Sequence, residues 1–202
     1  MSYYHDIITQ KSFGELQHLQ RLIRFVLIGG WAVYFYARAL KSKDIDILVD
    51  FDELPRLSEH YALSKNDRLK KYEAVKEEVQ IDVYLPHYST LGIPVEELLK
   101  HTRQMEGFTL VDPEYLAALK IHTCAERMRS PKGEKDLLDI VALLQSKHIR
   151  LEEVHHLLTA HRLEESLEAF LTLLSECTEL SELGLNAHAF AKLKKCILTT
   201  FR

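Results

Sequence analysis

The sequence predicts an α+β fold in which a mixed β-sheet is followed by an all-helical part. Up to about residue 111, short apolar stretches that alternate as strands do are interspersed with helical segments. From residue 112 onward, the apolar residues recur only at the three- and four-residue spacing of helices. The predicted domains are therefore residues 1–111, an α+β core, and residues 112–202, a helical domain.

Composition narrows the class of protein. The chain has 202 residues, 47% of them hydrophobic, and a formal net charge of -4, so it lacks the basic excess of a non-specific nucleic-acid binder. Its three cysteines are too few and too scattered for a disulfide framework or a zinc knuckle. Residues 1–10 do not read as an export signal, and the apolar residues 23–40 include two arginines and a glycine pair. We expect a cytoplasmic protein without a membrane association.

The core begins with a strand, a glycine turn and a helix. After a predicted helix at residues 12–22, residues 25–28 form an apolar run that stops at Gly29 and Gly30, and residues 31–40 resume as a helix. The aromatic residues of this second helix are more typical of a packed core than of a base-stacking surface.

Three aspartates project from predicted strands. Residues 44–51 alternate with the period of two of a strand, which places Asp44 and Asp46 on one face. After a predicted helix at 54–63, a hairpin of residues 71–75 and 79–85, joined by 76–78, places Asp82 opposite its own apolar face. The remaining predicted helices cover residues 113–128, 134–145, 151–158, 164–174 and 187–199.

These aspartates form a candidate metal site. Paired carboxylates on one strand face can hold one or two divalent cations, and Mg²⁺ commonly bridges a few carboxylates to substrate phosphates. A glycine pair before a helix lets the backbone approach a triphosphate, whose oxygens suit the helix N-terminus. Such a triad supports in-line displacement at an α-phosphate. Asp44 and Asp46 alone are more typical of a solvated strand end than of a metal site, but the glycine turn and Asp82 favour the metal site.

The same segments resemble the nucleotidyltransferase-fold superfamily related to DNA polymerase β. Its signature is hG[GS] followed by DhDh, and here residues 27–33 read LIGGWAV and residues 43–49 read KDIDILV. Within this superfamily, the chain is most similar to AbiEii-like, toxin-type nucleotidyltransferases. Their helical part carries a pattern that is matched here by Lys120, Arg127 and residues 135–140, KDLLDI. The resemblance covers about residues 22–145.

The resemblance implies the nucleotidyltransferase fold and a role for each matched residue. Lys120 and Arg127 lie seven residues apart, on one helix face, where a solvated basic face is the alternative interpretation. Lys135 and Asp139 have the spacing of an ordinary helical ion pair. The implied metal ligands are Asp44, Asp46 and Asp82, the last also a candidate general base, and the implied nucleotide contacts are Gly29, Gly30, Lys120 and Arg127.

The sequence departs from the family beside the aspartate pair. Many relatives carry an arginine and a threonine where this chain has Leu40 and Ser42. The nearby cations left for the nucleotide are Lys41, Lys43 and Arg38. Because lysine cannot make the bidentate phosphate contacts of arginine, the nucleotide is expected to be held differently.

The implied reaction transfers a nucleoside monophosphate from an NTP to a hydroxyl group, with two Mg²⁺ ions and release of pyrophosphate. The implied acceptor is a tRNA 3′ end or a protein side chain, and the implied role is that of a toxin with an antitoxin partner. RNA would be guided by a local basic cluster. Residues 29–33, GGWAV, also resemble aminoglycoside and lincosamide nucleotidyltransferases, and a catalytically silent nucleotide-binding or antitoxin module is a third interpretation. The basic cluster comprises Lys120, Arg127, Arg129 and Lys132.

Overall fold

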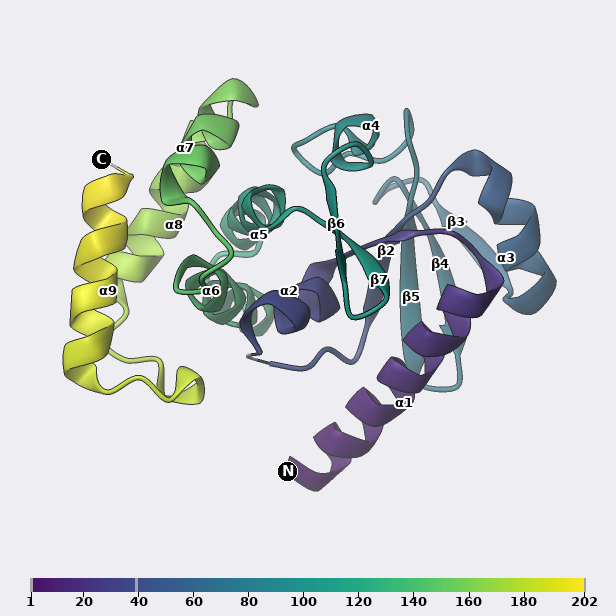
Figure 1. Cartoon of the computed structure of the whole chain (residues 1–202), viewed down its shortest axis with the longest axis horizontal. Helices are drawn as coiled ribbons and strands as arrows, with labels where there is room; N and C mark the ends of the chain where they lie inside the picture. The colour runs from purple at the N-terminus through teal and green to yellow at the C-terminus, as the bar shows by residue number, and fades with distance from the viewer. Residues whose placement is uncertain (1, 39, 202) are drawn as a thin grey trace. The chain divides into compact units, whose positions relative to one another are not determined.

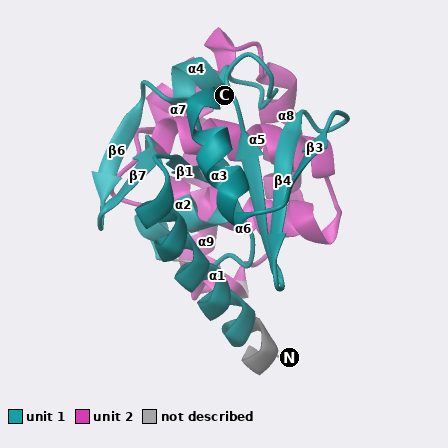
Figure 2. Cartoon of the chain, turned by 90° about the vertical axis from the view of Figure 1, so that its right-hand side faces the viewer, with its two compact units in different colours: residues 1–112 teal, residues 113–202 magenta. Residues whose placement is uncertain are grey.

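The computed structural model describes residues 2–38 and 40–201 (Figure 1). The chain divides into two compact units, Met1–Asp112 and Pro113–Arg202, which Figure 2 distinguishes by colour. Unit 1 contains a seven-stranded mixed sheet with helices, and unit 2 is helical, which confirms the predicted α+β fold class. No helix in the described part of the chain combines the length and apolarity needed to cross a membrane.

The strands of unit 1 follow the order β3-β4-β5-β2-β1-β7-β6. β2 lies at the centre, antiparallel to β1 on one side and parallel to β5 on the other. The elements of unit 1 are α1 Ser2–Leu22, β1 Val26–Ile28, α2 Gly29–Ala37, β2 Ile45–Leu48, η1 Phe51–Glu53, α3 Leu54–His60, β3 Leu63–Asn66, β4 Lys71–Lys76, β5 Val79–Tyr84, α4 Val95–Leu98, β6 Thr102–Met105 and β7 Phe108–Val111.

The central strands show the predicted alternation. In β5, the residues alternate between buried and half-buried positions along the whole strand, with Ile81 and Val83 fully buried. The two edge strands, β3 and β6, were not predicted, because each carries polar residues at its middle positions and neither buries an alternating apolar face. Polar edges suit a sheet that must not pair with other chains. β7 was also not predicted, although it carries apolar residues at three of its four positions.

The first two helices are joined by a buried hydrogen bond. Trp31 Nε1 donates to Ser12 Oγ at 2.9 Å, and both residues are at most 1% exposed. The rings of Phe13 and Trp31 lie 5.2 Å apart between their centroids. The aromatic side chain at the start of α2 is therefore part of the core. The first helix begins at Ser2, ten residues before the predicted start.

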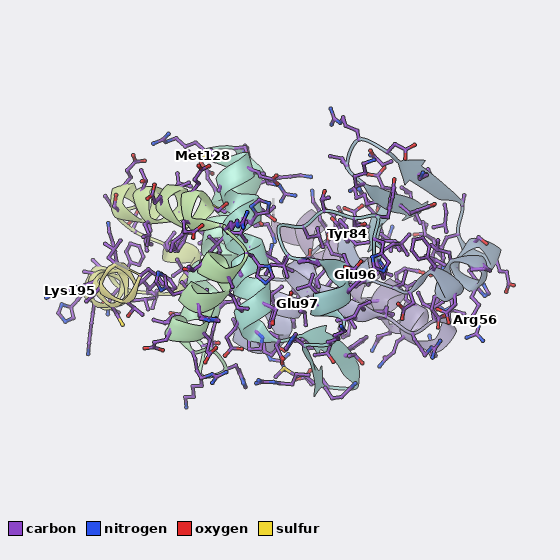
Figure 3. All side chains as sticks on the ribbon, turned by 90° about the horizontal axis from the view of Figure 1, so that it is seen from above. Arg56, Tyr84, Glu96, Glu97, Met128 and Lys195 are labelled. Carbon is purple, nitrogen blue, oxygen red and sulfur yellow. The ribbon has the colours of Figure 1, made fainter. Side chains whose placement is uncertain are left out.

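Unit 2 contains α5 Pro113–Arg127, α6 Pro131–Leu144, α7 Leu151–Ala160, α8 Glu164–Glu176, η2 Ser181–Leu183 and α9 Ala187–Thr200. The helix predicted at residues 134–145 was expected to begin after Pro131 and Gly133, which is wrong. Both lie in the first turn of α6, where Ser130 Oγ caps the helix by accepting from the Gly133 amide at 3.1 Å. A Cβ at Gly133 would stand 1.9 Å from the carbonyl oxygen of Met128, whose exposed side chain is labelled in Figure 3.

The Ser12–Trp31 hydrogen bond provides a test of core packing. Ser12→Ala leaves the buried indole N–H without its partner, which we expect to lower the free energy of unfolding by about 1–3 kcal/mol. Urea denaturation followed by circular dichroism at 222 nm measures this loss in every variant, including those that lack Trp31. In a Trp31→Phe background, Ser12→Ala is expected to cost much less. An equal cost in both backgrounds would show that the hydrogen bond is not the cause.

Candidate active site

The pairing of three strands positions the central carboxylate of the site. Ile28, the last residue of β1, lies opposite Asp46 in β2, and Asp46 in turn lies beside Asp82 in β5. Residues paired directly in neighbouring strands project from the same face of the sheet, with backbones about 4.8 Å apart. Gly29 follows Ile28 immediately, so the sheet brings the glycine turn and two of the three predicted carboxylates together.

Gly29 packs directly against the Asp46 carboxylate. Its backbone has φ +66°, a left-handed conformation that favours glycine, and a Cβ at this position would lie 2.0 Å from Asp46 Oδ2. Gly29 and Gly30 form the first turn of α2 rather than a separate turn before it. The N-terminal end of α2 therefore begins at the carboxylate, and the N-terminus of a helix is a place where backbone N–H groups can bind an anion.

Asp82 is bonded through both of its oxygens to neighbouring side chains. Lys71 Nζ donates to Asp82 Oδ2 at 2.6 Å, and Gln80 Nε2 donates to Asp82 Oδ1 at 2.8 Å. Lys71 is 7% exposed and also contacts Glu73 Oε1 at 3.0 Å. Burial lowers the pKa of Lys71, but hydrogen bonds to Asp82 and Glu73 outweigh burial and raise it overall. The lysine is therefore a charged partner of the predicted third ligand.

Sequence reasoning did not identify Lys71 and Glu73, although the hairpin contains a signal for them. Lys76 pairs with Val79, so the turn consists of two residues, with Glu77 at φ 53°. This register places Glu73 directly opposite Asp82 and puts Lys71 on the same face of β4. A third acidic strand position therefore lies beside Asp46 and Asp82, and the lysine balances part of its charge.

The segment before β2 places the remaining predicted residues of unit 1. Asp44 is half-buried in a bend just before the strand, two residues from Asp46, and Lys41 and Lys43 are exposed. Arg38 forms an ion pair with Glu106 and lies over the ring of Tyr34, 5.4 Å from its centroid. Lys41 and Lys43 therefore remain the candidate cations beside the aspartate pair.

The carboxylates of unit 1 are of the chemical type that holds a divalent cation. Across the described residues, no three acidic, histidine or cysteine side chains converge closely enough to form a ready metal site. Asp44 and Asp46 are carboxylates two residues apart, and Asp46 lies against Gly29 at the start of α2, a donor set that suits Mg²⁺ with phosphate oxygens. Asp82 accepts hydrogen bonds from Lys71 and Gln80, which a cation at this carboxylate would have to displace.

In unit 2, Lys120 is enclosed by two buried carboxylates. Its Nζ lies 2.9 Å from Asp136 Oδ1 and 2.8 Å from Asp139 Oδ2, and these aspartates are 2% and 0% exposed. Burial lowers the pKa of Lys120, but the charges of Asp139 and Asp136 outweigh burial and raise it. The lysine is thus held charged by unit 2 itself.

The predicted basic cluster of unit 2 is largely neutralised within that unit. Arg127 pairs with Asp136 at 2.9 Å, and Arg129 pairs with Glu176 at 2.7 Å. Lys135 contacts Asp139 at 3.2 Å, the helical ion pair that the spacing indicated. A phosphate that binds to Lys120, Arg127 or Arg129 must therefore compete with a carboxylate already in place.

Comparison with solved structures places this fold among known ones. The chain is similar to an H. pylori protein assigned as a nucleotidyltransferase, with a TM-score of 0.53, 13% identity and 95% of each chain covered. The antibiotic-resistance factor ANT(2″)-Ia gives a TM-score of 0.54 at 14% identity, covering 83% of this chain and 96% of that one. The Megavirus polyadenylate synthase gives 0.50 at 13% identity, covering 73% of this chain and 32% of that one.

These likenesses define the fold of the chain as that of nucleotidyltransferase-like proteins. This confirms the nucleotidyltransferase fold that the sequence predicted. No protein-family model matches the sequence, and no curated protein matches it.

Substitution of Gly29 tests the contact between the glycine and Asp46. Gly29→Ala forces a Cβ into the Asp46 carboxylate at an unfavourable φ, so we expect the free energy of unfolding to fall by more than about 1 kcal/mol. Gly14→Ala is the matched control, because nothing lies within 4 Å of its Cβ position in α1, and we expect no loss. Urea denaturation measures both variants. Equal stability of the two would contradict the close packing at Gly29.

Removal of the buried lysine tests the ion cluster of unit 2. Lys120→Met leaves Asp136 and Asp139 buried without their common cation, so we expect a loss of about 3–5 kcal/mol in the free energy of unfolding. Lys132→Met changes an exposed lysine and is expected to stay within about 0.5 kcal/mol of the wild type. Circular dichroism at 222 nm during urea denaturation follows the helices of unit 2. A small loss for Lys120→Met would mean that the cluster does not stabilise the fold.

Proposed function

We propose that the chain is a magnesium-dependent nucleotidyltransferase that moves a nucleoside monophosphate from an NTP to a hydroxyl acceptor. The fold supports this proposal, because it is shared with nucleotidyltransferase-like structures. The observation that carries it is the contact of Gly29 with the Asp46 carboxylate at the start of α2. A fold alone hosts many functions, whereas a carboxylate at an anion-binding helix end is a specific chemical arrangement.

Each residue of the site has a role in this proposal. Asp44 and Asp46 would hold the divalent cation, and the backbone amides at Gly29 and Gly30 would bind phosphate oxygens of the NTP. Asp82 stands beside Asp46 as the third carboxylate, paired with a lysine. When bound, the cation neutralises charge that develops on the phosphate oxygens.

The sequence resemblance also proposes basic side chains as contacts of the nucleotide. Lys41 and Lys43 are exposed near the aspartate pair and would contact the triphosphate as point charges. Lys120 and Arg127 keep the nucleotide-binding role that the resemblance implies, although both are bonded to carboxylates of unit 2.

The acceptor is proposed on the resemblance to AbiEii-like proteins, which favours a tRNA 3′ end or a protein side chain and a toxin with an antitoxin partner. The likeness to ANT(2″)-Ia favours a second candidate, an antibiotic as acceptor. The pairing of Arg127 and Arg129 with carboxylates reduces the attraction for RNA that the sequence alone indicated.

Labelled transfer assays test the activity and separate the acceptors. The protein is incubated with each α-labelled NTP and Mg²⁺, together with total tRNA, a protein extract, or an aminoglycoside and lincosamide panel. We expect label on one class of acceptor and its loss when Mg²⁺ is chelated. Asp46→Asn should reduce transfer by at least about 100-fold, because the cation supplies several kcal/mol of transition-state stabilisation.

Asp50→Asn is the matched control, since Asp50 is an exposed carboxylate just beyond β2. Its transfer rate should remain within about twofold of the wild type, and circular dichroism should show both variants folded. Bound NTP without label on any acceptor would support the silent nucleotide-binding module instead. Undiminished transfer by Asp46→Asn would refute the assigned role of this residue.

A further inference from the structure

Both carboxylate oxygens of Asp82 accept hydrogen bonds from neighbouring side chains. Lys71 Nζ lies 2.6 Å from Asp82 Oδ2, and Gln80 Nε2 lies 2.8 Å from the other oxygen. The side chains of Lys71 and Asp82 are 8% and 13% exposed, so water screens their pairing only weakly. This arrangement differs from a carboxylate that awaits a cation.

The surroundings of Lys71 fix it in this position. Glu73 accepts from Lys71 at 3.0 Å and from Asn66 Nδ2 at 3.2 Å, which connects β3, β4 and β5 through side chains. The same register aligns Glu73, Asp82 and Asp46 in one row across three neighbouring strands. Lys71 belongs to β4, on the opposite side of β5 from β2, and it balances Glu73 and Asp82, the two carboxylates of the row that it contacts.

A buried lysine is costly unless it is paired, and an apolar residue of similar size could fill the same volume. The charge of Lys71 therefore affects how the row of carboxylates can bind a cation. An ammonium group and a divalent cation repel each other and compete for the same oxygens.

We propose that Lys71 is a built-in counter-ion that keeps Asp82 out of the metal coordination sphere, so that the chain binds a divalent cation through Asp44 and Asp46 alone. This inference rests on the metal site of the proposed function. Lys71 is a positioning residue in this view, because it acts through Asp82 and touches neither metal nor nucleotide.

Metal binding without turnover tests this inference. Mn²⁺ is titrated into the full chain and followed by isothermal titration calorimetry, for the wild type, Asp82→Asn, Lys71→Met and the double variant. In the wild type, Asp82→Asn is expected to weaken Mn²⁺ binding little. In the Lys71→Met background, Asp82 becomes available as a ligand. There, Asp82→Asn should raise the Kd for Mn²⁺ by a factor at least about five times the factor that it causes in the wild type.

The matched control uses Lys65→Met as the background in place of Lys71→Met. This variant removes an exposed lysine from the neighbouring strand β3. In that background, Asp82→Asn should have the same small effect as in the wild type. Circular dichroism verifies that each variant is folded. If Lys71→Met does not fold, Lys71→Gln takes its place in the same comparison, because it keeps a hydrogen-bond donor without the charge.

The outcomes separate this inference from the proposed function. Equal effects of Asp82→Asn in the wild-type and Lys71-substituted backgrounds would overturn the role of Lys71. Asp46→Asn should abolish Mn²⁺ binding in every background. Retained binding by Asp46→Asn, or no binding by the wild type, would instead overturn the metal site itself, and the inference with it.

Discussion

The register of β2 between β1 and β5 is the constraint on which the site depends. Asp46 pairs with the last residue of β1 on one side and with Asp82 on the other, so one strand aligns the glycine turn and two carboxylates. A shift by one residue would move Asp46 to the apolar face and bury a carboxylate beneath the helices. The fully buried Ile45 and Ile47 on either side of Asp46 fix the register through the hydrophobic effect.

Both units use the same electrostatic solution for closely spaced carboxylates. Lys71 lies between Asp82 and Glu73, and Lys120 lies between Asp136 and Asp139. Carboxylates held this close repel one another, and burial removes the water that would screen them. A shared lysine compensates both at once. The consequence for function is that acidic residues in this chain cannot be counted as metal ligands until their cationic partners are known.

The sequence predicted the features that depend on the alternation of apolar and polar residues within a strand. It missed the features that depend on how the strands pair with one another. Strand β5 and the placement of Asp82 followed from alternation within a few residues. The partner of Asp82 did not, because the predicted turn at residues 76–78 is one residue longer than the observed one. The longer turn would set Tyr72, instead of Glu73, opposite Asp82. The polar edge strands β3 and β6 likewise carry no apolar alternation from which to predict them.

The ion pairs of the basic residues also could not be predicted from the sequence, because their partners lie farther along the chain. Lys120 and Arg127 have the spacing of a basic helix face, and the sequence alone favours a phosphate or RNA as their partner. The structure pairs them instead with carboxylates of α6, nine to nineteen residues away along the chain. Their positive charge is largely balanced inside unit 2, so any polyanion must displace or share these contacts. The attraction of this chain for an RNA acceptor therefore depends on how easily those ion pairs open, and its net charge and basic residue count do not determine it.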